Sequence, residues 1–123
     1  MRIIRNSIIP FKGFAAINLF GVVFVRKEIQ PQFNVTQRYW DIMLNHELIH
    51  TAQMKELLYI PFYLWYVFEW LIRLAIYRDT RKAYRNISFE REAYTNQYNT
   101  AYTVKRNKFA WRQYLKQRTN ERY

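Results

Sequence analysis

The only two histidines of the chain, His46 and His50, lie four residues apart, and Glu47 directly follows the first of them. On a helix with about 3.6 residues per turn this spacing places both imidazoles on one face, where they can bind one metal ion. Glu47 lies roughly 100° further round the helix, where its carboxylate can reach a metal-bound water instead of the metal. This HExxH pattern predicts a Zn²⁺ site with Glu47 as general base for hydrolysis.

The motif lies in a stretch that predicts one helix over residues 36–59. Thr36 is a suitable N-cap, and apolar residues recur after it at three- and four-residue spacings. Gln53 and Asn45 are candidates to support the site, because a metal-bound His donates its other N–H to an oxygen acceptor. Gln53, one turn after His50, is preferred over Asn45; the alternative is that both are ordinary polar helix residues.

A third protein ligand is expected, because a catalytic zinc ion usually has three and keeps one position open. The chain contains no cysteine and both histidines are already used, so this ligand must be Asp or Glu. Glu90 and Glu92 lie on the next well-capped predicted helix, and since they are two residues apart only one of them can bind. Glu90 shares a helix face with Ala93 and Gln97, and the small Ala93 would allow that face to pack close to the helix of the two histidines. Glu90 is therefore the predicted ligand, with Glu92 as the alternative.

These residues give the chain a resemblance to the gluzincins, HExxH metallopeptidases whose third zinc ligand is a Glu on a second helix. In many gluzincins that helix carries Glu-x-x-Ala-Asp. Glu90 and Ala93 match the Glu and the Ala, whereas Tyr94 occupies the position of the Asp, which in the family orients a ligating His. The chain also resembles small bacterial proteins with a strand-rich start, an HExxHxxQ helix, an aromatic segment and a Tyr-x-Asn-x-x-Phe-Glu-x-Glu-Ala stretch, which begins here at Tyr84.

The resemblance implies a zinc-dependent hydrolase, most simply a peptidase with a peptide or protein as substrate. Zn²⁺ would acidify its water, and Glu47 would take the proton and pass it to the leaving amine. Tyr94 and Tyr84 are the candidates for an oxyanion stabiliser. The alternative function is a non-catalytic, metal-stabilised module that binds a membrane surface or a partner protein.

The whole pattern predicts one domain over residues 1–123, of α+β class and mostly helical. Residues 1–29 predict strands with a turn near Gly21, and we expect a small antiparallel sheet. This sheet should pack on the pair of helices that carry the HExxH motif and the downstream Glu. The helix of the third ligand is expected over residues 88–104, with Ser88 as its N-cap.

Residues 57–77 form a continuous aromatic and apolar stretch, in which Pro61 should kink the helix or restart it over residues 60–77. Three interpretations stay open: a helix in the protein core, a helix in the membrane interface, and a bilayer span. Glu69 and Arg73 argue against a span, because each costs roughly 2.5–3.5 kcal/mol at the bilayer centre. Their four-residue spacing allows them to pair.

A net charge of +11 makes nucleic acid or an anionic membrane surface a candidate partner. A fifth of the residues are aromatic, which favours the membrane surface, and no nucleic-acid-binding motif is present. Residues 105–123 predict a solvated basic tail or, alternatively, a short amphipathic helix. The N-terminus lacks the pattern of a secretory signal. We therefore expect a cytoplasmic protein, or one associated peripherally with a membrane through residues 57–77 and the tail.

Overall fold

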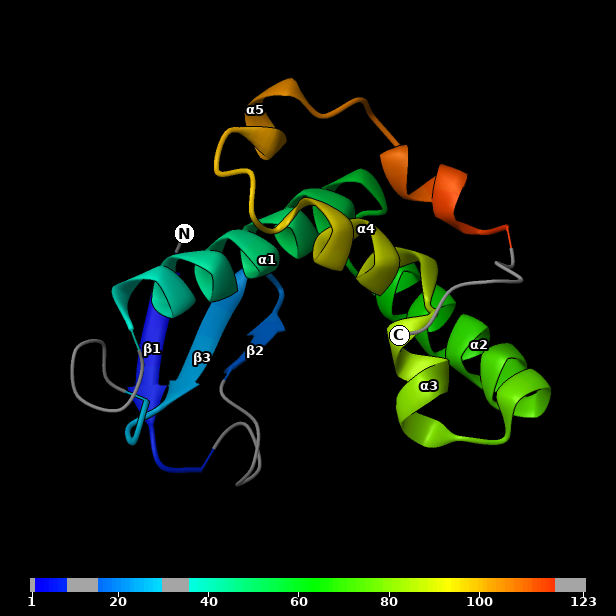
Figure 1. The fold of residues 1–123 in the computed structure, drawn as a ribbon, viewed down its shortest axis with the longest axis horizontal. Coiled ribbons are helices and arrows are strands. Elements are labelled where there is room, and N and C mark those ends of the chain that lie inside the picture. Colours follow the sequence, from blue (N-terminus) through cyan, green and yellow to red (C-terminus); the bar gives the residue numbers. More distant parts are fainter. Residues whose placement is uncertain (1, 9–15, 30–35, 117–123) are drawn as a thin grey trace.

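A small sheet precedes a series of helices in the computed structural model, which describes residues 2–8, 16–29 and 36–116 (Figure 1). This arrangement confirms the predicted α+β, mostly helical fold. The longest helix lies against the sheet, and the later helices pack on its other side and at its C-terminal end (Figure 1).

The sheet consists of β1 (Arg2–Asn6), β2 (Ala16–Leu19) and β3 (Val22–Arg26), in the order β1-β3-β2. Strand β2 pairs antiparallel with β3, whereas β1 pairs parallel with it, so the prediction of an antiparallel sheet was wrong for β1. The physical reason is the central position of β3. This strand is the most apolar of the three, and its Val23 and Val25 are fully buried. The hairpin partner β2 occupies one side of β3 and leaves the other side for β1, which runs opposite to β2 and therefore parallel to β3.

Helix α1 (Gln37–Glu56) carries the HExxH motif and begins as predicted. The Oγ1 atom of Thr36 accepts a hydrogen bond of 3.0 Å from the backbone N–H of Tyr39. After a short turn the chain continues as α2 (Ile60–Tyr77), which has Pro61 in its first turn. Pro61 therefore restarts the helix, as expected for a residue that lacks the backbone N–H needed further inside one.

Within the described residues, no single helix has both the length and the hydropathy of a membrane span. Helices α1 and α2 together meet that test, as a pair bent by 111°. Glu69 and Arg73 on α2 pair as predicted, with 3.2 Å between Arg73 Nη2 and Glu69 Oε2.

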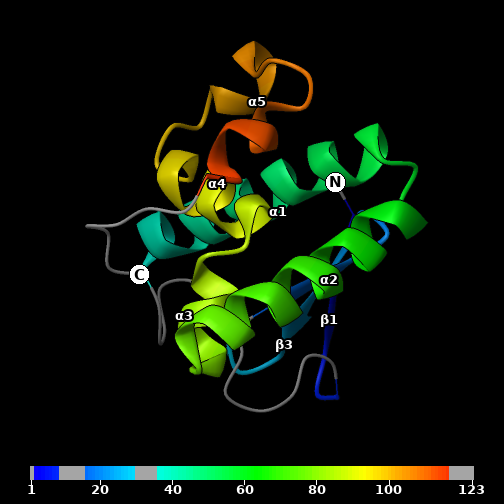
Figure 2. The same cartoon turned by 90° about the vertical axis from the view of Figure 1, so that its right-hand side faces the viewer.

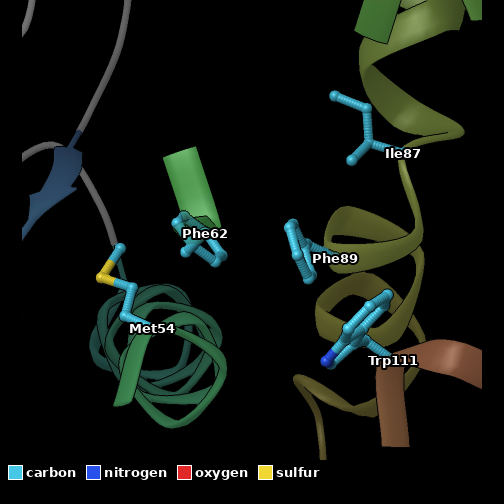
Figure 3. Close-up of a cluster of buried hydrophobic side chains, with 5 residues drawn as sticks. All are labelled: Met54, Phe62, Ile87, Phe89 and Trp111. Carbon is cyan, nitrogen blue, oxygen red and sulfur yellow. The ribbon is translucent and has the colours of Figure 1, made fainter. Parts of the chain in front are cut away.

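The hydrophobic core lies where α1, α2, the later helix α4 (Ser88–Asn96) and a C-terminal 3₁₀ helix, η1 (Ala110–Tyr114), meet (Figure 3). Phe62 and Phe89 stack at its centre with 4.5 Å between ring centroids. The buried members of this cluster are Met54, Phe62, Ile87, Phe89 and Trp111. Since these residues come from four segments, the core fixes the position of α4 relative to the motif helix.

Helix α4 (Ser88–Asn96) follows the short α3 (Thr80–Arg85) and starts in a way that the sequence did not predict. Ser88 is its first residue and not its N-cap. The Glu69 carboxylate accepts hydrogen bonds from the Ser88 backbone N–H at 2.7 Å and from its hydroxyl at 2.6 Å. A carboxylate from α2 thus caps α4, where it also complements the helix dipole.

The end of α4 at Asn96 contradicts the predicted helix over residues 88–104. Asn45 of α1 donates its side-chain N–H groups to the carbonyl oxygens of Gln97 and Asn99, at 2.7 and 3.0 Å. These carbonyls therefore find partners outside the helix, and the chain turns away before the one-turn helix α5 (Tyr102–Lys105).

Residues 105–116 fit the alternative prediction of a short amphipathic segment better than a fully solvated tail: Lys105, Lys108, Arg112 and Lys116 are exposed, whereas the side chains of Arg106 and Trp111 are buried. Arg106 is buried, and its guanidinium pairs with Glu92 at 2.5 Å and with Glu56 at 2.9 Å. The fully buried carboxylate of Glu92 and the partly buried one of Glu56 lie together, and Arg106 supplies the cation that a buried charge requires. Trp111 then enters the core. Residues 117–123 lie outside the described part of the chain.

Candidate metal centre

Three ligand atoms from α1 and α4 converge in the structure. The Oε1 atom of Glu90 lies 3.1 Å from Nε2 of His46 and 3.1 Å from Nε2 of His50, and these two nitrogens are themselves 3.1 Å apart. A tetrahedral zinc ion with bonds of about 2.0–2.1 Å holds its donors about 3.3 Å apart. The group therefore could hold a metal ion with little adjustment.

The hydrogen bonds on the far side of each imidazole define which nitrogens carry the protons. Nδ1 of His46 lies 2.8 Å from Oε1 of Gln97, and Nδ1 of His50 lies 2.8 Å from Oε1 of Gln53. An amide oxygen only accepts, so each Nδ1 is the donor. In the neutral rings both Nε2 atoms then carry lone pairs. These two nitrogens lie 3.1 Å from each other and from Oε1 of Glu90, so three hydrogen-bond acceptors are in contact. Such a cluster of acceptors requires a cation or a shared proton.

Gln53 has its amide orientation fixed by its other contacts. Its Nε2 donates to the carbonyl oxygen of Phe89 and to Oε1 of Glu92, both at 3.0 Å, which leaves Oε1 for His50. The structure thus places Gln53 behind His50, where the sequence predicted it. Asn45, the other candidate, touches no imidazole; it supports the segment that carries Gln97.

Glu92 is turned away from the two imidazoles. Its fully buried carboxylate is surrounded by Arg106, the hydroxyl of Tyr102 at 2.6 Å, and the Gln53 amide. Residues two apart on a helix differ by roughly 200° in direction, so Glu90 and Glu92 cannot face the same site. In the structure Glu90 lies against the two histidines, whereas Glu92 accepts a hydrogen bond from the Gln53 amide on the far side of His50.

Tyr66 of α2 is a member of the site that the sequence analysis missed. Its hydroxyl donates to Oε2 of Glu90 at 2.5 Å, which leaves Oε1 of the same carboxylate directed at the two histidines. Burial is the main reason why the pKa of the Tyr66 hydroxyl is raised, and the neighbouring Glu90 charge adds to it. Tyr66 therefore stays a hydrogen-bond donor. Several tyrosines occur in this stretch, and their spacing alone does not single it out.

The two tyrosines proposed as oxyanion stabilisers have different places. Tyr94 packs edge-on against His46, with 4.5 Å between ring centroids, and the Arg85 guanidinium lies 3.7 Å from the centroid of the Tyr94 ring. Tyr84 lines the cavity beside the metal ligands, and its hydroxyl lies 3.4 Å from that of Tyr94. Gln97, and not Tyr94, lies against the Nδ1 atom of His46.

The electrostatics of the site follow from burial and from the two histidines. Burial raises the pKa of Glu47, Glu90 adds to this, and the two imidazoles partly oppose it. Burial also disfavours the charged form of His50, but the Glu90 charge and hydrogen bond outweigh it and raise the pKa of His50 to about 9. The pKa of Glu90 lies below its ordinary value, because His50 and His46 outweigh its burial. In the metal-free protein a proton therefore balances the Glu90 charge.

A cavity of about 410 Å³ adjoins the ligands. Its polar end contains Glu47, whose side chain makes no hydrogen bond to any of the described residues. Apolar and aromatic side chains from β2, α1 and α2 form most of its wall. The lining residues are Ala16, Ile17, Asn18, Leu19, Glu47, His50, Met54, Phe62, Tyr63, Tyr66, Tyr84 and Glu90.

Strand β2 is fixed beside this cavity by Asn18. The Asn18 amide donates to the backbone carbonyl of Glu47 and to Oγ1 of Thr51, both at 2.8 Å, and its Oδ1 accepts from the backbone N–H of Gly21 at 3.0 Å. Gly21 adopts a φ of +86°, which favours glycine. The edge strand is thereby held at a defined distance from the HExxH helix.

No family model matches the chain, and neither the curated proteins nor the solved structures gave a match.

Proposed function

We propose that the protein is a zinc-dependent hydrolase that acts on peptide bonds, as its resemblance to the gluzincins implies. The observation that carries the proposal is the meeting of three acceptor atoms at 3.1 Å from one another, two of them imidazole lone pairs. Two imidazole nitrogens and one carboxylate oxygen, without a thiolate, are the donor set of the His₂Glu catalytic zinc sites.

Glu47 is the proposed general base and acid. When bound, the metal would lower the pKa of its water toward neutrality and polarise the substrate carbonyl. Glu47 lies in the same cavity, next to His46 in the chain, and has a raised pKa because of its burial. A carboxylate of this kind accepts a proton from water and later delivers it to the leaving amine.

The substrate is proposed to bind as an extended segment along β2. This strand is at the edge of the sheet, and all four of its residues line the cavity. An edge strand offers backbone groups to a peptide, which would then run past Glu47; the Asn18 carbonyl, which accepts from the Tyr63 hydroxyl at 3.3 Å, would exchange this partner for a substrate N–H. The apolar walls favour a hydrophobic side chain of the substrate in the cavity.

Tyr84 is the preferred oxyanion stabiliser of the two candidates, because it lines the cavity whereas Tyr94 lies against His46. Burial is the main reason why the pKa of Tyr84 is raised far above its ordinary value, and the nearby Glu90 charge adds to it. The hydroxyl therefore keeps its proton and can donate it to a developing negative charge.

The test measures metal content and cleavage separately. The purified chain should contain about one equivalent of zinc by elemental analysis, and the double variant His46→Ala, His50→Ala should contain less than about a tenth of an equivalent. A mixture of random synthetic peptides, read by mass spectrometry, should be cleaved by the wild type. Glu47→Gln should abolish cleavage and retain zinc, whereas the exposed control Glu28→Gln should retain both.

A wild type that purifies with a different metal, or without one, would refute the zinc assignment. The second candidate function is a metal-stabilised module without catalysis. It is favoured by one observation: the ligands join α1 to α4 and two of them are buried, as in a structural site. Two results together would support the non-catalytic module: the wild type binds zinc but cleaves no peptide in the mixture, and Glu47→Gln leaves the cellular phenotype unchanged.

A further inference from the structure

Helix α2 has its polar and apolar sides reversed relative to an ordinary surface helix. Its only two charged residues, Glu69 and Arg73, face inward and are 4% and 6% exposed. They pair with each other, Glu69 caps α4, and Arg73 donates to the carbonyl oxygen of Leu115 at 2.7 Å. The inner side of α2 thus contains the charges that surface helices normally present to water.

The outer side of α2 is apolar along its whole length. In Figure 2 the helix runs across the near side of the molecule. Every exposed position on it carries an apolar or aromatic residue. These residues, here called the outer face of α2, are Ile60, Pro61, Leu64, Trp65, Val67, Phe68, Leu71, Ile72, Ala75 and Ile76. An 18-residue helix is about 27 Å long, so this face is a stripe much larger than the scattered apolar residues of a soluble surface.

Basic side chains lie at the border of this face. Arg78, Arg81 and Lys82 are exposed just beyond the C-terminal end of α2, where Asp79 is the one acidic residue and caps α3. Lys82 Nζ lies 4.9 Å from the centroid of the Tyr77 ring, which keeps this charge close to the end of α2.

The C-terminal segment contributes further basic residues near α2. The 3₁₀ helix η1 packs mainly on α4 and contacts α2 at one point, where Trp111 lies against Trp65 with 5.9 Å between ring centroids. Arg112 and Lys116, next to Trp111 and Leu115 in the chain, are both exposed. Together with the net charge of +11, these residues give the border of the outer face a positive potential.

We propose that the outer face of α2 docks on the surface of a lipid bilayer that contains anionic lipids, with the helix lying in the plane of the interface. The apolar stripe would enter the boundary between headgroups and acyl chains, and the flanking arginines and lysines would contact lipid phosphates. The indole N–H of Trp65 donates inward to Glu69 at 3.2 Å, so its exposed ring surface would face the lipid. Glu69 and Arg73 would stay covered by protein in this orientation.

The charge distribution distinguishes the bilayer from a second copy of the chain. A symmetric dimer through this face would bring the two basic borders together if the helices ran parallel. If they ran antiparallel, it would place each basic border beside the apolar N-terminal end of the other α2. In neither arrangement does the outer face supply an anionic group opposite the basic residues. Anionic lipid headgroups neutralise such a border. Docking would also bring the metal ligands near the membrane, since Phe62, Tyr63 and Tyr66 on the inner side of the same helix line the cavity. The docking proposal itself does not depend on catalysis.

Flotation of the full chain with vesicles tests the proposal. The chain is synthesised in a cell-free system with vesicles of phosphatidylcholine containing about one third phosphatidylglycerol, or of phosphatidylcholine alone. We expect it to float with the anionic vesicles and much less with the neutral ones. Phe68→Asp and Leu71→Asp should each weaken binding about tenfold or more, because each residue would otherwise be buried in the bilayer. Val104→Asp, which changes an exposed apolar residue on α5, should leave binding unchanged.

Two further measurements separate the electrostatic and geometric parts of the proposal. Arg81→Glu and Lys82→Glu should each weaken binding to anionic vesicles about fivefold or more and leave the weak binding to neutral vesicles unchanged. Brominated lipids should quench tryptophan fluorescence, and Trp65→Phe should remove most of that quenching.

Failure of the wild type to float with anionic vesicles would overturn the proposal. A second result would also overturn it: no binding to vesicles, together with a dimer in solution that sedimentation detects and that Phe68→Asp dissociates. This result would assign the outer face to contact with a second copy of the chain. Equal binding by wild type and Phe68→Asp would also contradict it, because the outer face would then not be the contact.

Discussion

Gln97 holds the imidazole of His46 through a 2.8 Å contact between its Oε1 and Nδ1 of the histidine. The two residues come from α1 and from the segment just after α4, so the contact defines both the tautomer of His46 and the direction of its Nε2 lone pair. Tyr94, one turn earlier, packs against the same imidazole with its ring and makes no hydrogen bond to it, so Gln97 alone of these two orients His46.

Replacement of Gln97 by Leu should weaken zinc binding about 10–100-fold, because His46 would lose the acceptor that orients it. Competition with a chelator of known affinity measures the change. The exposed Gln113→Leu on η1 is the matched control and should bind zinc like the wild type. Gln97→Glu, which keeps an acceptor oxygen at this position, should restore most of the affinity; equal affinities for wild type and Gln97→Leu would show that Gln97 is a bystander.

Replacement of Gln53 by Leu should lower both zinc affinity and the free energy of unfolding. Gln53 is fully buried and links His50 to Glu92 and to the Phe89 carbonyl. The loss of these partners should cost about 2–4 kcal/mol in the metal-free protein, as measured by urea unfolding. The loss of stability in the metal-free protein distinguishes Gln53 from Gln97, because replacement of Gln97 should affect mainly zinc binding. Unchanged stability of Gln53→Leu would contradict the interpretation.

Replacement of Glu69 by Gln should destabilise the protein by about 3–5 kcal/mol, since the buried Arg73 would lose its charge partner and α4 would lose its anionic cap. Urea unfolding measures the loss. Asp41→Asn, which changes an exposed carboxylate in the first turns of α1, should change stability by less than about 0.5 kcal/mol. Similar effects of the two substitutions would mean that the capping of α4 by α2 contributes little.

Metal-free protein should lose stability as the pH rises toward 9. The pKa of His50 is raised from 6.5 to about 9 by Glu90, which outweighs the burial of the imidazole. A raised pKa means that the folded state binds the proton more tightly. Its contribution is therefore complete below about pH 6.5 and is lost as the pH rises through about 9. Urea unfolding of wild type and His50→Gln across this range should show the extra slope only in the wild type.

Zinc should displace the proton that His50 binds in the metal-free protein. Titration calorimetry near neutral pH, in buffers of different ionisation enthalpy, should therefore show about one proton released for each zinc ion bound. A binding enthalpy that is independent of the buffer would rule out the protonated imidazole in the metal-free state.

The ligand set could be predicted largely from the sequence. His46, Glu47 and His50 lie within about one turn of a single helix, and helix geometry determines their relative directions whatever surrounds them. The same geometry showed that only one of Glu90 and Glu92 can bind, and the choice of Glu90 rested on the face that it shares with the small Ala93 and on the resemblance to the gluzincins. The position of Gln53 behind His50 could also be predicted, because the two residues lie one turn apart on the same helix.

The contacts that complete the site were decided by the tertiary structure. Tyr66 reaches Glu90 from α2, Glu69 caps α4, and Arg106 compensates Glu92 because the packing of separate segments brings these groups together. The same packing turns the charges of α2 inward and leaves its apolar side exposed, which the composition of residues 57–77 left undecided. Local spacing specifies direction on one helix, whereas burial and long-range hydrogen bonding select which helices meet and which of their faces they present.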